Sequence, residues 1–172
     1  MSEIVENEVE LEEDTQKDKF LTFILGDEVY GIEIQFVTEI IGLQPVTEIP
    51  DLPEYVKGII NLRGKIIPVI DVRLRFKKSA SQYNDRTCII VVEIKDVAVG
   101  LIVDTVAEVL TITTQDIVPP PQFNNGRYFQ RFIKGIGKVE NSVKLILDCD
   151  RLLNDKEMDS LEQLSAEQSI KQ

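Results

Sequence analysis

The side chains best suited to chemistry in this 172-residue chain are carboxylates. The sequence has 30 aspartates and glutamates against 19 lysines and arginines, and it has no histidine. Histidine is the commonest general base and a usual zinc ligand, so acid–base catalysis would fall to carboxylates. A small carboxylate-dependent hydrolase would use Glu39 and Asp71, but no spacing in the sequence places these two side chains opposite each other. The composition therefore argues against an enzyme without eliminating this carboxylate-dependent alternative, which a deep polar pocket with paired acids would support.

Other residues with chemical potential have structural explanations. Asp71 and Asp148 each follow an apolar run and precede a predicted helical turn, where a carboxylate caps the helix start. Cys88 lies in an apolar run and Cys149 directly after one, so both are interpreted as small buried hydrophobic residues. Two cysteines without histidine do not make a zinc site. We expect no metal and no cofactor.

Asn61, Arg63 and Gly64 lie at the tip of a predicted hairpin between two apolar runs. Glycine supplies a positive φ in such a turn, and asparagine can bond to its own backbone. A turn does not require a guanidinium, whose planar donors suit a carboxylate or main-chain carbonyls of a partner. Two interpretations of Arg63 stay open: a partner contact, or a turn residue that is solvated or paired with an acid such as Glu39.

The elements that must position these residues are mainly short strands. Because no long amphipathic helices separate the apolar runs, the pattern favours closed or nearly closed barrels over a helix-covered parallel sheet. The first two strands form a hairpin around the turn Gly26-Asp27. The predicted strands cover residues 20–25, 29–34, 46–49, 59–62, 65–70, 87–94, 97–103, 106–112, 133–139 and 143–147.

Helices are predicted at two places. From Gln35 onward, three apolar residues fall at helical spacing and Gly42 supplies a C-cap, which predicts a short helix. After Asp148 the chain is predicted helical over 151–153 and 158–170. The second of these segments places an apolar stripe, expected to pack against the barrels, at Met158, Leu161 and Leu164.

The connecting segments and the tail are polar. Residues 77–86 are expected to link two halves, and residues 119–126 are expected to form a loop that combines three prolines with an Asn-Gly turn. Residues 1–19 hold eight acids against Lys17 and Lys19, which predicts a disordered acidic tail.

The bulk properties of the chain exclude several classes of partner. A net charge of −11 argues against nucleic acid and anionic membranes as partners. No secretory signal and no membrane-spanning run occur, so we expect a cytoplasmic protein.

An internal repeat divides the chain. Residues 31–40 recur as 100–109 at an offset of 69, and residues 56–71 recur as 133–148 at an offset of 77. The change in offset matches the longer second loop. Either match alone is weak, but their common order argues for duplicated halves rather than for coincidence in a strand-rich composition. The sequence thus predicts two similar small barrels.

Specific motifs give the chain a resemblance to the CheW family of bacterial chemotaxis coupling proteins. The residues that carry it are the run Asn-Leu-Arg-Gly-x-Ile-Ile-Pro-Val-Ile-Asp at 61–71 and the hairpin motif at 20–32. The linker at 83–85, the segment 99–104 and the closing Leu-Leu-Asn at 152–154 also match, so the resemblance covers about residues 20–158. The acidic tail and the Asn-Asn-Gly sequence at 124–126 are not part of the family pattern.

The resemblance implies two SH3-like, five-stranded β-barrels with short helices and a C-terminal helix. We expect a disordered tail over 1–19 and a domain over 20–155. Its barrels would lie near 29–78 and 86–148, with a strand over 20–25 that the second barrel could share, and a helical tail would cover 156–172.

The implied function is non-enzymatic coupling of methyl-accepting chemoreceptor tips to the histidine kinase CheA, through the kinase's own CheW-like domain. We expect a monomer in isolation that is recruited to membrane-bound receptor arrays. In such proteins the helical hairpin of the receptor lies in an apolar groove between the barrels. The matching positions here are Val37, Glu39, Ile40, Gly58, Asn61, Arg63, Gly64, Val106 and Val109. Residues of the kinase interface are not named by the sequence.

Two alternatives accompany this interpretation. The four apolar positions could be ordinary core residues of their own barrels, Ile40 among them. The whole chain could instead be an SH3-like module that binds polyproline, although such modules use an aromatic groove and this sequence has no tryptophan and 6% aromatic residues. A preference for PxxP peptides over receptor helices would favour that module.

Overall fold

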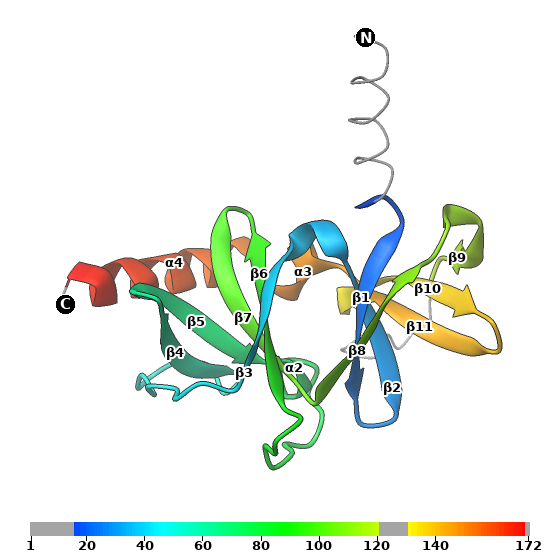
Figure 1. Ribbon diagram of the computed structural model, residues 1–172. Coiled ribbons are helices and arrows are strands. Elements are labelled where there is room, and N and C mark those ends of the chain that lie inside the picture. The colour runs from blue at the N-terminus through cyan, green and yellow to red at the C-terminus, as the bar shows by residue number, and fades with distance from the viewer. Residues whose placement is uncertain (1–15, 121–130, 171–172) are drawn as a thin grey trace, which may run out of the picture.

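The computed structural model describes residues 16–120 and 131–170, and it confirms a mainly β protein with two sheets (Figure 1). Figure 1 shows the five-stranded sheet on the left, the six-stranded sheet on the right, and the C-terminal helix extending along the five-stranded side. The strands are β1 Lys19–Leu25, β2 Glu28–Glu33, β3 Val37–Gly42, β4 Val56–Leu62, β5 Lys65–Asp71, β6 Cys88–Ile94, β7 Val97–Val103, β8 Thr105–Thr111, β9 Ile117–Val118, β10 Ile133–Val139 and β11 Ser142–Leu147. The helices are the 3-10 turns η1 Ile34–Phe36 and η2 Thr114–Asp116, and α2 Val72–Arg75, α3 Cys149–Leu152 and α4 Asp155–Ile170.

The two sheets exchange strands between the halves of the chain. The six-stranded sheet has the order β8-β1-β2-β11-β10-β9, and the five-stranded sheet has the order β3-β6-β7-β5-β4. Thus β1 and β2, the first two strands of the first half, lie in the sheet of β8 to β11. Conversely, β6 and β7, the first two strands of the second half, lie in the sheet of β3 to β5. The expected contiguous division into 29–78 and 86–148 differs from this pairing, because β2 joins the second half and β6 and β7 join the first. The strand expected over 20–25 is β1, which pairs with β8 of the second half.

The register of the strands reproduces the internal repeat. Gly31 of β2 lies opposite Ile146, and the repeat-equivalent Gly100 of β7 lies opposite Val69, in parallel pairing in both cases. Register shifts also recur, between Val56 and Gly58 in β4 and between the corresponding residues of β10. The duplication predicted from sequence is therefore present in the hydrogen-bonded pattern of the strands.

Arg75 of α2 lies where the two halves meet. Its guanidinium stacks on the rings of Tyr55 and Phe132, 4.4 and 4.8 Å from their centroids. These two aromatic residues are separated by the repeat offset of 77, and they carry the carbonyls that accept from the N–H groups of Asp71 and Asp148. Arg75 thus ties together equivalent loops of the two halves.

One large apolar cluster lies between the sheets and joins them. It contains side chains from both sheets and from the helices, including Phe23, Tyr30, Ile90, Leu101 and Leu152, and we call it the shared core. Two smaller clusters belong to single sheets: one around Ile60, Val69, Ile89 and Ile102, the other around Phe20, Ile112 and Ile146. The shared core makes the two sheets a single packed body.

Helix α4 covers the outer side of the β4–β5 hairpin. The predicted stripe is confirmed, because Met158, Leu161 and Leu164 are all buried. Met158 and Leu161 extend the shared core, and Leu164 packs on Ile59 and Ile66. The start of the helix is held by Glu157, whose carboxylate accepts hydrogen bonds from Arg75 and Tyr55 and from the N–H of Asn154.

Two local predictions are wrong. Residues 37–42, expected to be helical, form strand β3, because a bulge between Val37 and Glu39 places Val37 and Ile40 on one face at a spacing of three residues. Residues 46–49, expected to be a strand, contribute only an isolated bridge between Thr47 and Ile59. Strand β9 was not predicted, since two residues leave no periodic signal. Residues 1–15 and 121–130, which include most of the expected tail and loop, lie outside the described residues.

Candidate functional site

Strand β3 places Val37 and Ile40 on the face that looks toward the shared core. Val37 lies directly opposite Val92 of β6, and Ile40 directly opposite Ile90. Directly opposed residues in an antiparallel pair project to the same face. Val92 and Ile90 are members of the shared core, so Val37 and Ile40 lie on the same side of the sheet.

Strand β8 repeats this arrangement in the other sheet. Val106 lies opposite Phe23 of β1 and Val109 opposite Leu21, and both β1 residues belong to the shared core. The bulge recurs here as well, between Leu21 and Phe23. Val106 and Val109 are therefore the structural as well as the sequence equivalents of Val37 and Ile40.

The four residues differ in depth. Val37 and Val106 are half-buried and pack against the shared core, whereas Ile40 is 45% exposed and Val109 50% exposed. Both strands are at the edge of their sheets. The apolar surface of the shared core thus continues to solvent along β3 and β8, and Ile40 is not the buried core residue that was the alternative from sequence.

Glu39 faces the opposite side of β3 and pairs with Arg63. The Arg63 guanidinium donates to the Glu39 carboxylate at 2.5 Å, so the ion pair considered from sequence is formed. Arg63 is 71% exposed along its side chain, whereas the second carboxylate oxygen of Glu39 is buried without a hydrogen-bond partner. Both residues line a shallow depression of about 330 Å³ with Thr38, Leu62, Val91 and Glu93; it contains none of the other seven candidate residues.

The hairpin tip has the geometry expected of its residue types. Arg63 and Gly64 are the two residues between β4 and β5, and both have positive φ, 52° and 87°. This is the pattern of a type I′ turn. The N–H of Gly64 donates to the side-chain oxygen of Asn61 at 2.9 Å. Asn61 and Gly64 therefore shape the turn that presents Arg63.

Gly58 lies apart from these residues and has a structural role. Its φ is 147°, and a Cβ built there would be 2.1 Å from the carbonyl oxygen of Thr47. Only glycine allows the isolated bridge between Thr47 and Ile59 to form at this bulge.

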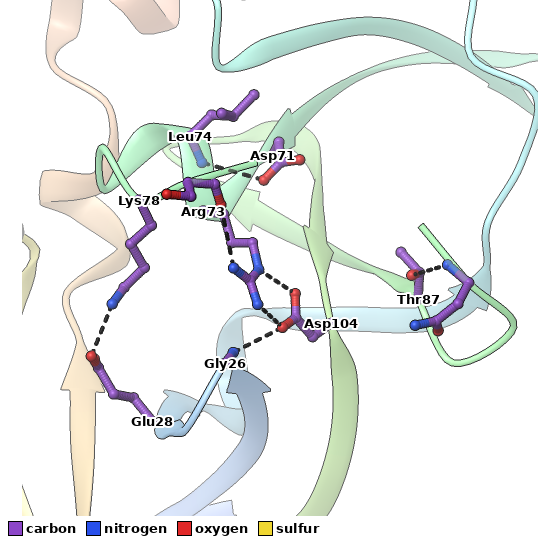
Figure 2. Close-up of polar contacts among 10 residues, drawn as sticks. Gly26, Glu28, Asp71, Arg73, Leu74, Lys78, Thr87 and Asp104 are labelled. Atoms are coloured by element: carbon purple, nitrogen blue, oxygen red, sulfur yellow. Dashed lines mark hydrogen bonds and ion pairs between the residues drawn. The ribbon is translucent and has the colours of Figure 1, made fainter. Parts of the chain in front are cut away.

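A polar cluster that sequence reasoning did not select anchors the start of β8 (Figure 2). The carboxylate of Asp104 accepts two hydrogen bonds from Arg73 of α2 and one, at 2.8 Å, from the N–H of Gly26. Figure 2 also shows Lys78 pairing with Glu28 beside this cluster, at 2.9 Å. Asp104 is two residues before Val106, so the cluster fixes where β8 begins. The feature of the sequence that pointed to this cluster was the pair Val103-Asp104 within the matching segment 99–104.

Hydrogen bonds outweigh burial in setting the pKa of Asp104 in this cluster. The hydrogen bond from Arg73 lowers the pKa of the Asp104 carboxyl below its usual range, burial opposes this, and the Gly26 N–H reinforces it. The same bond raises the pKa of Arg73. Both groups are charged at neutral pH, and the pair is bidentate, which favours a fixed geometry.

The two carboxylates considered for hydrolysis do not meet. Glu39 pairs with Arg63, whereas Asp71 is buried and accepts from the Tyr83 hydroxyl at 2.6 Å and from the N–H of Leu74. Burial and the bond to Asp71 raise the pKa of Tyr83. Asp71 is thus a helix cap and linker anchor, as its repeat partner Asp148 is a cap for α3.

No other described group suggests catalysis or metal binding. Burial raises the pKa of the Cys149 thiol to about 12, so this cysteine is not a nucleophile at neutral pH. Within residues 16–120 and 131–170, no group of three or more cysteine or acidic side chains could hold a metal ion. No helix among these residues is long and apolar enough to cross a membrane.

Comparison with known proteins gives consistent matches. Residues 19–157 match the family model described as CheW-like domain. The chain is 37% identical over 145 residues to the chemotaxis protein CheW of Klebsiella aerogenes, covering 84% of this chain and 87% of that protein. It is 35% identical to the protein of the same name from Treponema pallidum, covering 85% and 88%.

A solved structure agrees with these sequence relatives. The crystal structure of the scaffolding protein TtCheW from Thermoanaerobacter tengcongensis superposes with a TM-score of 0.75 and 40% sequence identity. The match covers 82% of this chain and 97% of that one. The two-sheet arrangement with exchanged strands therefore has an experimental counterpart.

Proposed function

The chain belongs to the CheW-like family, and from this premise we propose that it is a non-enzymatic adaptor of bacterial chemotaxis. In this proposal it couples the cytoplasmic tips of methyl-accepting chemoreceptors to the histidine kinase CheA and transmits the receptor state to kinase activity. It would work in the cytoplasm, recruited to membrane-bound receptor arrays. The names of the relatives, chemotaxis protein CheW and scaffolding protein, support this role.

The observation that carries the receptor half of the proposal is the exposed apolar pair Ile40 and Val109. These residues occupy equivalent edge positions in the two sheets, and each lies beside a half-buried valine that packs on the shared core. An amphipathic helix that covered them would remove apolar surface from water at a place already backed by packed side chains. In this proposal, the helical hairpin of the receptor packs against Ile40 and Val109 and the half-buried valines beside them.

The charged residues would set the register of the receptor. Arg63 projects from a two-residue turn and keeps most of its side chain in solvent while it pairs with Glu39. Its remaining guanidinium donors are available to a carboxylate or a main-chain carbonyl of the bound hairpin. Charges at the rim of an interface contribute to specificity and orientation more than to raw affinity.

The kinase would contact other parts of the molecule, because an adaptor holds both partners at once. The CheW-like domain of the kinase would present similar sheets, and pairing between related domains is physically natural. The proposal therefore requires a complex in which the receptor, this chain and the kinase are bound at the same time.

A co-precipitation with purified components tests the proposal. The full chain is mixed with a tagged receptor signalling domain and with kinase. We expect kinase to be retained on the receptor only when the chain is present, and kinase autophosphorylation to rise only in that mixture. Retention of kinase to the same extent without the chain, or binding of only one partner, would contradict the adaptor role.

A further inference from the structure

The outer face of the β10–β11 hairpin carries an apolar surface outside the candidate receptor site. Ile136 lies directly opposite Leu145, and Lys138 directly opposite Val143, so these four side chains share one face. Val143 is 53% exposed, and Ile136 and Leu145 are half-buried. Leu145 also packs against the shared core, so the row runs outward from packed side chains to solvent.

The repeat identifies the equivalent face in the first half, where it is covered. At the offset of 77, Ile136 and Val143 correspond to Ile59 and Ile66 of the β4–β5 hairpin. Those two residues are only 6% and 5% exposed, because Leu164 of α4 packs on them together with Ile49 and Leu52. The same structural position is therefore covered by α4 and a loop in the first half, and is partly exposed to solvent in the second.

The fold explains why α4 covers only one of the two faces. The helix begins at Asp155, soon after β11, and is tied at its start through Glu157 to Arg75 and Tyr55. From there it runs along the five-stranded sheet, away from the β10–β11 hairpin (Figure 1).

Charge points to the nature of the missing helix. The chain has a net charge of −11, yet residues 133–147 contain three lysines against the single acid Glu140. Lys134 is paired with Glu33, and Lys144 lies opposite Gly137 on the other face of the hairpin, so Lys138 is the lysine that the open face presents. Lys138 is exposed on the open face itself, where the covered hairpin has the neutral Asn61. A helix with carboxylates beside its apolar stripe would complement this hairpin.

We propose that the outer face of the β10–β11 hairpin docks an acidic amphipathic helix of a partner protein, in the way that α4 docks on the β4–β5 hairpin. The apolar stripe of that helix covers Ile136, Val143 and Leu145, and a carboxylate pairs with Lys138. The inference rests on the repeat and on the charge of the hairpin, and it does not depend on which residues bind the receptor.

The chain itself supplies a suitable probe. A fluorescently labelled peptide of residues 154–170 carries the apolar stripe of α4 together with the exposed acids Asp159 and Glu162. It is titrated against the full ¹⁵N-labelled chain, whose own α4 already occupies the β4–β5 face. Affinity is read by fluorescence anisotropy and location by amide chemical shifts. A peptide with Leu161 and Leu164 replaced by serine is the control ligand.

We expect saturable binding with shifts centred on Val143 and Lys138. Val143→Asp is expected to weaken binding at least about tenfold, and Lys138→Glu to weaken it and reduce its salt dependence. The matched control is Leu43→Asp, an exposed apolar residue of another surface, which should bind as wild type.

Several outcomes would overturn the inference. Shifts centred on Ile59 and Ile66 would mean that the peptide only exchanges with α4, and equal affinity for Val143→Asp would remove this face from the site. A wild-type chain that dimerises through Val143 in sedimentation would assign the face to a second copy. Tighter peptide binding after deletion of residues 1–15 would assign it to the chain's own acidic segment. Failure to couple receptor and kinase, by contrast, leaves the result of this titration unaffected.

Discussion

Neighbouring residues of β3 lie on different surfaces, and a one-residue bulge determines which residues lie on which face. Ile40 continues the apolar row beside Val37, whereas Glu39 projects from the other face toward Arg63. Without the bulge, strict alternation would place Val37 with Glu39 and separate it from Ile40. The same holds for Val106 and Val109 in β8, so the exposed apolar pair depends on two equivalent bulges.

Arg63→Ala tests whether the guanidinium contacts a partner. Because the Arg63 side chain is 71% exposed, we expect the free energy of unfolding to change by less than about 1 kcal/mol. Affinity for the receptor tip should fall about fivefold or more. Isothermal titration against the receptor signalling domain measures this, with Arg86→Ala in the exposed linker as the control for loss of one positive charge. Unchanged affinity would remove Arg63 from the site.

Asp104→Asn tests the cluster that anchors β8. We expect a loss of about 1 kcal/mol of stability at neutral pH, a modest value because the carboxylate is partly exposed. The folded-state pKa of Asp104 is lowered, so its contribution is present above the unfolded-state pKa and is lost as pH falls. The stability difference between wild type and variant should therefore be constant from pH 7 to 5 and shrink below about pH 4.

Urea unfolding across this pH range measures the difference. Asp96→Asn, at an exposed turn position with positive φ that asparagine tolerates, is the control. A gap that widens at low pH, or an equal effect of Asp96→Asn, would contradict the role assigned to Asp104.

Among the elements, strands were predictable where alternation or a continuous apolar run was intact. Residues 97–103 and 133–139 match β7 and β10 at both ends. Prediction failed at β3 because its bulge imitates helical spacing, and the side-chain pattern alone cannot distinguish the two. The exchange of strands between halves was also hidden, since local and exchanged pairing bury the same faces of the same strands. The Arg63–Glu39 pair was foreseen as one of two possibilities, but the Asp104 cluster needed the tertiary structure.

Gly58→Ala tests the bulge of β4. A Cβ would overlap the carbonyl oxygen of Thr47, so the bridge must open, and we expect a loss of at least about 2 kcal/mol in the free energy of unfolding. Gly42→Ala is the matched control, because nothing lies within 4 Å of its added Cβ, and its effect should stay within about 0.5 kcal/mol. Equal effects of the two substitutions in chemical denaturation would contradict this account of Gly58.

For the molecule as a whole, exchanged strands and a shared core make the two sheets one unit. Each half contributes strands to both sheets, and the cluster between the sheets also includes α4 residues. A ligand bound across β3 and β8 would therefore contact both sheets at once, at the edge of the core that joins them. In the proposed adaptor, a partner bound there would contact the same packed core on which the other surfaces of the molecule depend.

The central claim, that Ile40 and Val109 form the receptor surface, is tested most directly by measuring the affinity of the receptor signalling domain for Ile40→Asp and for Val109→Asp. Ile40 and Val109 are exposed, and so is Gln82 in the linker, whose replacement in Gln82→Asp is the control for an added negative charge, so all three variants should melt close to wild type. We predict at least about tenfold weaker binding for Ile40→Asp and for Val109→Asp, and wild-type binding for Gln82→Asp. Wild-type affinity in both Ile40→Asp and Val109→Asp would contradict the account.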